Sequence, residues 1–469
     1  MIMAPEPITF LGRVKRDRAS GVVTPVAEAA RRMSSYRVAA SNDFPLMEQM
    51  RDRAREIRLH TLANLDRYLA QFASQVEANG GHVHWAADGD EANAIITEIA
   101  QANEVKSVVK SKSMVTEEIE LNEALEQVGI SVVESDLGEF IVQLSNDKPS
   151  HIIAPVLHKT RYDIGELFAD KLDAPYTTDP SQLTEIARSH LRREFLTADM
   201  GISGCNMGIA DSGTVVLVTN EGNGRLTTTA PRIHVTVMGM ERIVPSFADA
   251  SAVLEVLARA GTGQRLSVYT NLVSGPRRHG DPDGPDAFHV VILDNGRSRT
   301  LSGSEAEILA CIRCGACLNI CPVYREVGGH AYGFTYPGPI GAVVTPALKG
   351  LDEWHELPYA STLCGACVEA CPVRIDIPKM LLTLRSKAVD DGHLPGWLTF
   401  AVGRYASAAT HPRQFRVLLK AGGVVGSMMA KDGWITKAPS HGANWTGARD
   451  LPQPAKTPFH ARWKQRHGS

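Results

Sequence analysis

Apolar side chains recur at three- and four-residue spacing between residues 46 and 79. This spacing places on one helical face Leu59, Leu62, Leu65, Leu69 and Phe72. Two glycines at positions 80 and 81 end the pattern, so a long amphipathic helix is predicted. The preceding residues 1–49 hold four prolines and show little periodicity. They are predicted to form an irregular or loosely helical N-terminal arm.

After this helix, short apolar runs alternate with amphipathic segments. Residues 105–109 are predicted as a strand, residues 115–128 as a helix that ends at Gly129, and residues 130–133 as the next strand. A βαβ unit of this kind has a right-handed crossover, so its strands run parallel. Further strands are predicted at 152–153, 215–219, 234–238, 266–270 and 289–293, and further helices at 182–196 and 247–260. The alternation predicts one α/β domain over residues 50–295, with a glycine- and proline-rich loop at 273–287.

The composition is that of a globular protein. The 469 residues are 43% hydrophobic and 22% charged, with a formal net charge of −3. These values exclude a mainly disordered, collagen-like or coiled-coil chain, and they give no electrostatic basis for nucleic-acid binding. The N-terminus lacks the apolar run of a secretory signal, and no stretch approaches the roughly 18 apolar residues of a transmembrane helix. We therefore expect a cytoplasmic protein that reaches a membrane only peripherally, through partners.

Charge is distributed unevenly along the chain. Residues 401–469 carry 11 Lys and Arg but only two acids, Asp432 and Asp450, together with three tryptophans. The segment 393–469 is therefore predicted to be a basic, partly ordered extension that docks on a partner, on a membrane surface or on the body of the chain.

Seven of the eight cysteines fall between residues 311 and 371. A disulfide framework would spread cysteines through a small domain, so this crowding indicates metal binding. The first group has the C-x2-C-x2-C-x3-C-P spacing of bacterial ferredoxins and consists of Cys311, Cys314, Cys317 and Cys321. The second group repeats part of this spacing and consists of Cys364, Cys367 and Cys371. Ser361 stands where its first cysteine would be.

Together the two groups predict a helical, ferredoxin-like domain over residues 296–392 with two iron–sulfur clusters. In the ferredoxin pattern the last cysteine of each run binds the other cluster. Cluster one would then be held by Cys311, Cys314, Cys317 and Cys371, and cluster two by Cys321, Cys364 and Cys367. The fourth ligand of cluster two is left open between Ser361, water and another side chain, and this cluster is expected to lose iron readily to a [3Fe–4S] form. Two structural zinc sites or a redox C-x2-C pair are the alternatives, but zinc sites usually consist of separated C-x2-C pairs.

Two such clusters transfer single electrons and offer no place to transform a substrate. The chain has no G-x-G-x-x-G turn, no H-x-x-x-H pair and no G-x-S-x-G elbow. We therefore predict no catalytic residue, and we expect an electron-transfer subunit that needs a partner on each side.

A resemblance to a known family is visible in both cysteine runs. It is also visible in segments 108–114, 136–139, 151–155, 198–202 and 220–225. The chain resembles the lactate-utilisation protein B family, the iron–sulfur subunit of a three-component L-lactate oxidation system. The resemblance covers residues from about 57 to the C-terminus. It implies a lactate-utilisation, CoA-transferase-like α/β domain shared with the system's third component, and two [4Fe–4S] clusters on the seven cysteines. It also implies a role in growth on lactate, with the other subunits and an unidentified electron acceptor as partners.

Candidate binding residues outside the cysteine runs each have a plain structural alternative. Four residues after the strand at 215–219 either gather a ligand or form a glycine-rich turn: Asn220, Glu221, Asn223 and Arg225. Lys110 and Lys112 either bind an anion at a helix N-terminus or lie in a solvated loop. Cys205 is either a small buried thiol or a residue that reaches a cluster. His330 and His355 show no ligand spacing and are expected to be ordinary surface or core residues.

The function expected from the whole sequence is electron transfer within an NAD-independent L-lactate oxidation complex. A subunit that serves another 2-hydroxy acid, such as glycolate, is the nearest alternative. Another is an enzyme that binds and transforms a small acid through its α/β domain, and a third treats that domain as a docking scaffold only. Activity of the isolated chain with lactate and an artificial acceptor would favour the enzyme.

Overall fold

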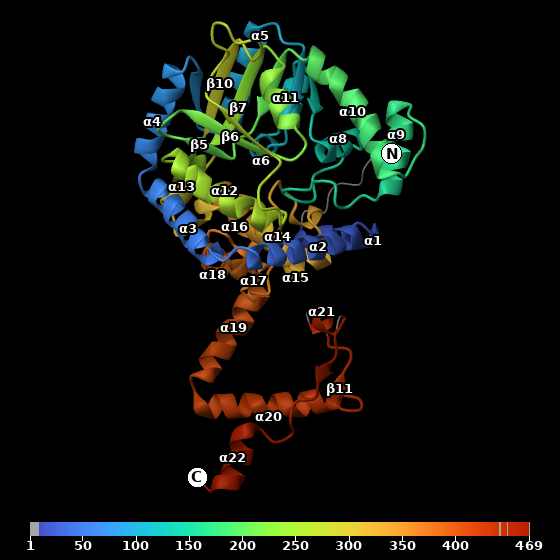
Figure 1. Cartoon of the computed structure of the whole chain (residues 1–469). Coiled ribbons are helices and arrows are strands. Elements are labelled where there is room, and N and C mark those ends of the chain that lie inside the picture. Colours follow the sequence, from blue (N-terminus) through green and yellow to red (C-terminus); the bar gives the residue numbers. More distant parts are fainter. Residues whose placement is uncertain (1–8, 440–441, 448, 469) are drawn as a thin grey trace. The chain divides into compact units, whose positions relative to one another are not determined.

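The computed structural model describes residues 9–439, 442–447 and 449–468. The chain forms two compact units, Met1–Asp390 and Asp391–Ser469 (Figure 1). The first unit contains the N-terminal helices, the α/β sheets and the whole cysteine region.

The central sheet of the first unit has six parallel strands in the order β1-β10-β7-β4-β2-β3. Their bounds are β1 His82–Ala86, β2 Ser107–Lys110, β3 Ser131–Glu134, β4 Met200–Ser203, β7 Ile233–Gly239 and β10 Ala287–Leu293. Every neighbouring pair is parallel. The inner strands β4 and β7 are buried throughout, as expected for a parallel sheet that is covered on both faces.

Helices cover both faces of this sheet. Val108 packs with Ile96 and Leu121, whereas the next residue, Val109, packs with Phe140 and Phe168. Successive strand residues point to opposite faces, so these two sets of helices lie on opposite sides of the sheet. The first set is α5 (Gly89–Ala102), α6 (Met114–Glu118) and α7 (Leu121–Gln127), and the second is α8 (Leu137–Leu144), α9 (Arg161–Leu172) and α10 (Pro180–Thr197).

A smaller, mixed sheet lies beside the central one. Its order is β8-β5-β6-β9, and its strands are β5 Met207–Ile209, β6 Thr214–Thr219, β8 Ile243–Val244 and β9 Tyr269–Val273. Two helices are interleaved with these strands, α11 (Asn223–Thr229) after β6 and α12 (Phe247–Gly261) after β8. Its buried residues join the core that continues into the cysteine region.

The strands predicted at 105–109, 130–133, 215–219, 234–238 and 289–293 are confirmed as β2, β3, β6, β7 and β10, and the helices predicted at 182–196 and 247–260 as α10 and α12. The strand predicted at 266–270 lies instead at Tyr269–Val273. The strand predicted at 152–153 is wrong, because the His151 ring accepts hydrogen bonds from the N–H groups of Ile153 and Ala154 and the backbone bends there. The helix predicted over 115–128 is two helices, separated at Glu120 with φ 53°.

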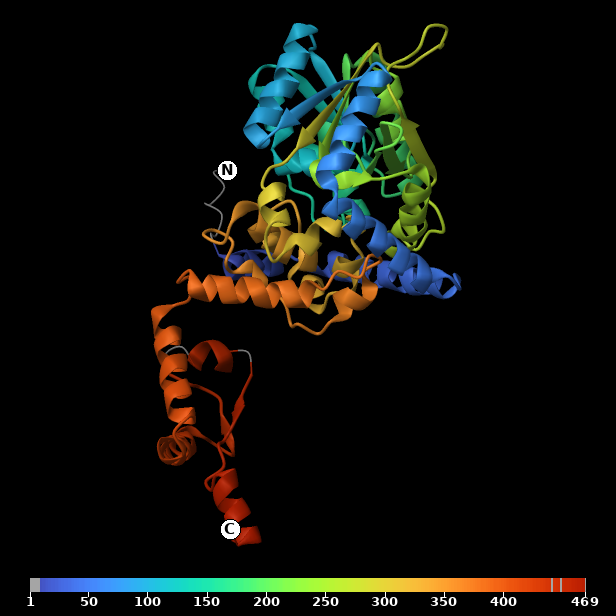
Figure 2. The ribbon, with the colours of Figure 1, turned by 90° about the vertical axis from the view of Figure 1, so that its left-hand side faces the viewer.

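The N-terminal residues form regular helices. Helix α1 spans Phe10–Ala19 and α2 spans Val23–Asn42. The small residues Val26, Ala27 and Ala30 of α2 are buried, and α2 contacts the helices that follow the first cysteines (Figure 2). Of the two predicted alternatives, the irregular arm is therefore wrong for these residues, and the helical one holds, with helices that are regular and packed. A face of small side chains gives little hydrophobic contrast in sequence, although it packs closely against another helix.

The single helix predicted over 46–79 is also divided. Helix α3 spans Met47–Ala63 and α4 spans Leu65–Ala78, and they meet at Asn64, whose backbone leaves the helical region with φ −131° and ψ 35°. The break turns α3 toward the cysteine region, while α4 packs against β1 and β8.

Short helices surround the cysteines and lead into a longer one. They are α13 (Arg297–Leu301), α14 (Ala316–Ile320), α15 (Pro322–Val327), α16 (Gly338–Lys349), α17 (Ala366–Ala370) and α18 (Ile377–Asp390). One hydrophobic core runs from Phe288 in the sheet to Leu318, Tyr336 and Leu381 in this region. The α/β part and the cysteine region are therefore joined by one core.

The second unit is mainly helical. It contains α19 (Gly396–Ala409), α20 (Pro412–Met429), α21 (Ala443–Thr446), α22 (Phe459–His467) and the antiparallel pair β11 (Trp434–Ile435) and β12 (Leu451–Pro452). Large apolar side chains such as Phe400 and Met428 are mostly exposed on it. Within the described residues, no helix combines the length and hydrophobicity needed to cross a membrane.

Candidate functional site

The two cysteine loops have the same backbone conformation. Arg313 and Leu363, which precede the second position of each run, have φ 57° and 55°, and Gly315 and Gly365 have φ 73° and 83°. A five-residue helix follows in each loop, α14 in the first and α17 in the second. Glycine adopts the left-handed conformation without the strain that a side chain adds. The repeat seen in the sequence is thus a repeat in structure.

The seven thiols form two groups by their mutual electrostatic effects. One group comprises Cys311, Cys314, Cys317 and Cys371, and the other comprises Cys321, Cys364 and Cys367. The groups adjoin at Cys367, which also interacts with Cys371 and Cys317. Burial, followed by repulsion between neighbouring thiolates, raises the pKa of Cys367 to about 12, and burial is the main cause that raises the pKa of Cys371 to about 11.

Such thiols keep their protons at neutral pH unless a metal replaces them. Thiolates are soft donors that select iron–sulfur clusters, zinc and copper(I) among biological metals. Backbone N–H groups also donate to the sulfurs, for example over 3.3 Å from Arg313 to Cys311, 3.4 Å from Tyr324 to Cys321 and 3.3 Å from Ile375 to Cys371. Hydrogen bonds to sulfur tune iron–sulfur clusters. The donor set and its surroundings therefore fit such clusters.

The second loop is more open than the first. Cys364 is exposed, whereas Cys314, which has the same position in the first loop, is buried. Hydrogen bonds, first from the Ala366 N–H, lower the pKa of Cys364. Solvent therefore has easier access to Cys364 than to Cys314.

Arginines of α3 hold the second loop by its carbonyl groups. Arg51 donates to the carbonyls of Glu369 and Cys371 at 2.8 and 2.9 Å, and Arg55 donates to the carbonyl of Arg374 at 2.6 Å. The last carbonyl groups of α17 have no following helical turn whose N–H groups could donate to them. The arginine side chains supply these missing donors.

Arg58 is fully buried and joins the first cysteine loop to the α/β part. It donates to the carbonyl of Ile243 at 2.6 Å and to the carbonyl of Leu309 at 3.1 Å. Arg51, Arg55 and Arg58 follow the i, i+4, i+7 spacing of one helix face. Sequence reasoning missed them because it followed the apolar positions of this helix, although the spacing of the arginines was a usable signal.

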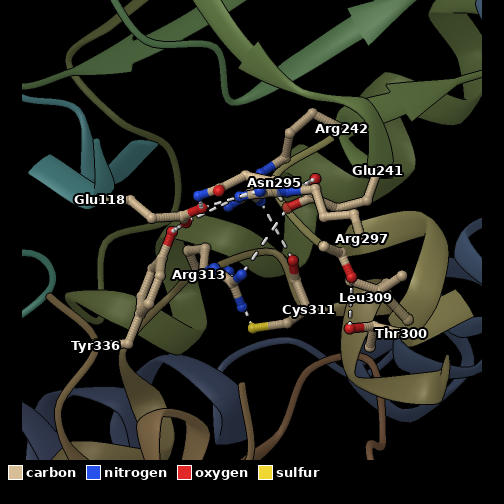
Figure 3. A network of polar contacts seen from close by, with 12 residues as sticks. Glu118, Glu241, Arg242, Asn295, Arg297, Thr300, Leu309, Cys311, Arg313 and Tyr336 are labelled. Carbon is tan, nitrogen blue, oxygen red and sulfur yellow. Dashed lines mark hydrogen bonds and ion pairs between the residues drawn. The ribbon is translucent and has the colours of Figure 1, made fainter. Parts of the chain in front are cut away.

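A buried network of charges lies beside the first cysteine loop (Figure 3). Arg297 contacts Glu118 at 2.9 Å and Glu241 at 2.7 Å, and all three side chains are almost fully buried. The Tyr336 hydroxyl donates to Glu118 at 2.7 Å. Burial opposes ionisation, but the positive charge of Arg297 outweighs it and lowers the pKa of Glu118 and that of Glu241, the latter to about 2. Both carboxylates are therefore charged.

Two further guanidinium groups carry this network to the cysteines. Arg242 donates to the carbonyl of Cys311 at 3.2 Å, and Arg313 lies over the Tyr336 ring, 4.5 Å from its centre. The same carboxylate oxygen of Glu241 lies 3.6 Å from Nε of Arg242 and 3.8 Å from Nη2 of Arg313. The network thus holds three guanidinium groups and two carboxylates, which leaves one positive charge in excess beside the first loop.

Lys110, the last residue of β2, and Lys112, just after it, are both held in ion pairs. Lys110 is completely buried, with its Nζ 2.7 Å from Glu134 and 3.3 Å from Glu117, and Lys112 pairs with Glu139. The solvated-loop alternative is therefore wrong. Because carboxylates already neutralise the Lys110 charge, Lys110 is not available to bind an added anion.

A cavity of about 260 Å³ lies where the ends of β2, β3 and β4 meet the first cysteine loop. Of the candidate residues after β6, Asn220, Glu221 and Asn223 line it, whereas Arg225 is exposed to solvent. Cys205 lines the same cavity as Cys314. Burial raises the pKa of Cys205 to about 12, so it is a neutral thiol.

His330 lies in a cluster of polar side chains. The ligand-type atoms of Asp147, His158 and His330 lie within 4.8 Å of one another. Asp147 is already paired, at 3.0 Å with His158 and at 3.1 Å with Lys159. The cluster is satisfied by its own hydrogen bonds and ion pairs, as expected for structural residues. His355 Nδ1 lies 3.2 Å from the carbonyl of Asp352.

Comparison with known families matches three successive parts of the chain. The LUD domain model matches residues 69–293, the 4Fe-4S dicluster domain model matches residues 307–375, and a model described as the C-terminal part of lactate utilisation protein B matches residues 398–468. Lactate utilization protein B of Bacillus subtilis (strain 168) is 47% identical over 436 residues, which are 92% of this chain and 91% of that protein. The chain belongs to the lactate utilization protein B family. A relative of the same name from Bacillus pumilus (strain SAFR-032) is 46% identical over 94% of this chain and 93% of its own length. Another, from Geobacillus kaustophilus (strain HTA426), is 48% identical over 88% of this chain and 87% of its own length.

Membership of the lactate utilization protein B family confirms the family prediction and the order of an α/β domain followed by an iron–sulfur domain. The CoA-transferase-like detail and the number of clusters stay predictions. Among solved structures, a DUF162 family protein from Deinococcus radiodurans aligns at 16% identity over 49% of this chain and 98% of its own, with a TM-score of 0.29.

Proposed function

We propose that this member of the family is an iron–sulfur electron-transfer subunit of an NAD-independent L-lactate oxidation system. Its relatives are named for lactate utilisation, and its dicluster domain supplies carriers of single electrons. The observation that carries the proposal is the pair of matching cysteine loops, whose thiols form two adjoining groups.

The ligands follow from the same two groups. Cluster one is held by Cys311, Cys314, Cys317 and Cys371, and cluster two by Cys321, Cys364 and Cys367 with a fourth ligand that is not a cysteine of this run. Support comes from the crossed positions of the two last cysteines: the Cys371 charge acts on Cys314 of the first loop, and the Cys321 charge acts on Cys367 of the second, although Cys367 also lies close enough to interact with Cys371. Reconstituted protein should bind about eight iron and eight sulfide per chain, as two [4Fe–4S] clusters require.

Electrons enter from a partner that oxidises the acid and leave to an acceptor that the chain itself does not contain. The other subunits of the lactate system are the proposed partners, and contact with a membrane is proposed to occur through them. The protein is proposed to be cytoplasmic. The excess positive charge beside the first loop favours electron occupancy of cluster one, since nearby cations stabilise added negative charge.

Growth of the source organism tests this function. Removal of the gene should abolish growth on L-lactate and spare growth on glucose, and the wild-type gene should restore it whereas Cys314→Ala should not. Loss of growth on glycolate with normal growth on L-lactate would instead favour a subunit that serves that 2-hydroxy acid.

A further inference from the structure

Three histidine side chains meet where the edge strand β1 and its neighbour β10 begin. His82 and His289 are direct partners in the parallel register, and His84 is two residues further along β1. Residues two apart in a strand point to the same face of a sheet, and neighbouring strands lie about 4.8 Å apart. The three imidazole rings therefore share one face of the sheet, although His84 and His289 are 205 positions apart in the chain.

The rings are close enough to bind one metal ion. The centre of the His289 ring lies 4.9 Å from that of His82 and 5.3 Å from that of His84. Nε2 of His84 lies 3.1 Å from Nδ1 of His289, and one ring donates its N–H to the other. Two imidazole nitrogens that bind one tetrahedral zinc ion, each roughly 2.0–2.1 Å from it, lie about 3.3 Å apart. A change of tautomer and a small rotation of each ring would convert the hydrogen-bonded pair into two ligands of one ion.

The chemical state and the surroundings of the rings suit a metal. Burial, followed by the charge of His82, lowers the pKa of His289 to about 4 and also lowers the pKa of His84. Both rings are therefore neutral at neutral pH, which is the form of histidine that binds metals. Helix α5 packs against both strands, and the carboxylate of its Glu98 acts on His84. The His82 ring is exposed, so ions in solution reach this site.

We propose that His82, His84 and His289 form a binding site for a divalent transition-metal ion of the zinc type. Imidazole nitrogens suit zinc, copper and nickel among such ions, whereas the cysteine loops offer thiolates. Water or the Glu98 carboxylate completes the coordination. The bound ion joins the edge strand β1 to β10 and so stabilises the edge of the central sheet. The inference goes beyond the proposed electron-transfer role and does not depend on it.

Titration calorimetry with zinc chloride, on the full-length protein purified anaerobically with its clusters, tests the proposal. One saturable site per chain is expected. His84→Gln should weaken zinc binding by a factor of roughly 10–100 or more, since even residues that only support a metal ligand contribute that much. His330→Gln is the matched control, because His330 is also half-buried and lies in another group of ligand-type side chains, with Asp147 and His158. Zinc affinity that is lost in His330→Gln and kept in His84→Gln would overturn the proposal.

X-ray absorption at the zinc edge identifies the ligands in the wild-type protein itself. The sample is the protein with intact clusters, loaded with one equivalent of zinc. Nitrogen or oxygen neighbours at about 2.0–2.1 Å, with the more distant scattering of imidazole rings, are expected, whereas thiolates would give zinc–sulfur distances of about 2.3 Å. Sulfur neighbours in this spectrum would place the ion on cysteines and overturn the proposal.

A second variant decides the test if His84→Gln fails to fold. His82 is exposed, so His82→Gln should fold normally, and it should still weaken zinc binding because one of the three imidazole ligands is lost. Equal zinc affinity in His82→Gln and the wild type, or a wild-type titration without a saturable site, would show that the rings are stacked for packing alone. Either result would overturn the proposal.

Discussion

Ser361 occupies in the second cysteine loop the position that Cys311 occupies in the first. The Leu363 N–H donates to Ser361 Oγ at 3.1 Å, as the Arg313 N–H donates to Cys311 Sγ at 3.3 Å. The two loops also share their backbone conformation, with positive φ at Arg313 and Leu363 and again at Gly315 and Gly365. A hydroxyl is harder and far less acidic than a thiol, so it is a poor ligand for cluster iron. The two clusters should therefore differ in durability.

Air exposure should convert cluster two to a [3Fe–4S] form while cluster one persists. The signal of this form in electron paramagnetic resonance should disappear in Cys364→Ala and persist in Cys311→Ala. Ser361→Cys should suppress it by supplying a fourth thiolate, whereas Ser361→Ala should leave it in place. Equal oxygen sensitivity of the two clusters, or loss of the signal only on removing Cys311, would contradict the ligand assignment.

Removal of one charge from the buried network should strongly destabilise the first unit. In Glu118→Gln, Arg297 loses a carboxylate at 2.9 Å inside the protein, and breaking a buried pair in this way costs about 3–5 kcal/mol. Urea unfolding followed by circular dichroism measures the change. Glu185→Gln is the control, because its ion pair with Arg188 at 2.8 Å is exposed and should matter little. Equal stability of Glu118→Gln and the wild type would show that the network is dispensable.

Removal of residues 391–469 should leave both clusters intact, because all seven cysteines lie in the first unit. Binding to partner subunits should weaken, and the binding that remains should depend less on salt, since the tail carries the excess of basic residues. Pull-down at several salt concentrations, with iron analysis of the same samples, measures both effects. The triple variant Arg413→Gln, Arg416→Gln, Lys420→Gln removes charge from α20 alone and should reproduce part of the loss. Loss of iron from the truncated chain would contradict a docking role.

Stability should fall as the pH decreases below about 6.5, in part because of His234. Burial lowers the pKa of His234 to about 3; its Nε2 lies 2.8 Å from Ser203 Oγ, and its Nδ1 has no hydrogen-bond partner among the described residues. The unfolded chain binds this proton at a higher pH than the folded one, so protonation favours unfolding by up to about 1.4 kcal/mol per pH unit. Between pH 6.5 and 4.5 the wild type should lose about 2 kcal/mol more than His234→Gln. Urea unfolding at both pH values measures this difference, with the exposed His60→Gln as control; identical pH profiles for the wild type and His234→Gln would contradict it.

The sequence predicted what depends on neighbouring residues. The apolar runs that became β7 and β10 are continuous because both faces of these strands are covered, and the cysteine spacing is a local property of each loop.

Features that depend on distant partners could not be predicted. The carbonyls that Arg51 contacts lie more than 300 positions later in the chain, at Glu369 and Cys371. Ile152 was predicted to lie in a strand because it is apolar. An apolar side chain indicates burial, but it does not indicate which part of the chain covers it. The cavity likewise combines the ends of three strands with Arg313, a combination that exists only after the two domains have packed together.

In the proposed function, electrons from lactate pass through the clusters of this chain. The protein should be purified anaerobically together with its partner subunits, and its visible absorbance recorded before and after addition of L-lactate. Bleaching of the cluster absorbance by L-lactate is expected, with no bleaching of the isolated chain and none in a complex that carries Cys314→Ala and Cys367→Ala together. Absorbance that stays unchanged in the intact complex, although the same complex converts lactate to pyruvate with an artificial acceptor, would contradict the account.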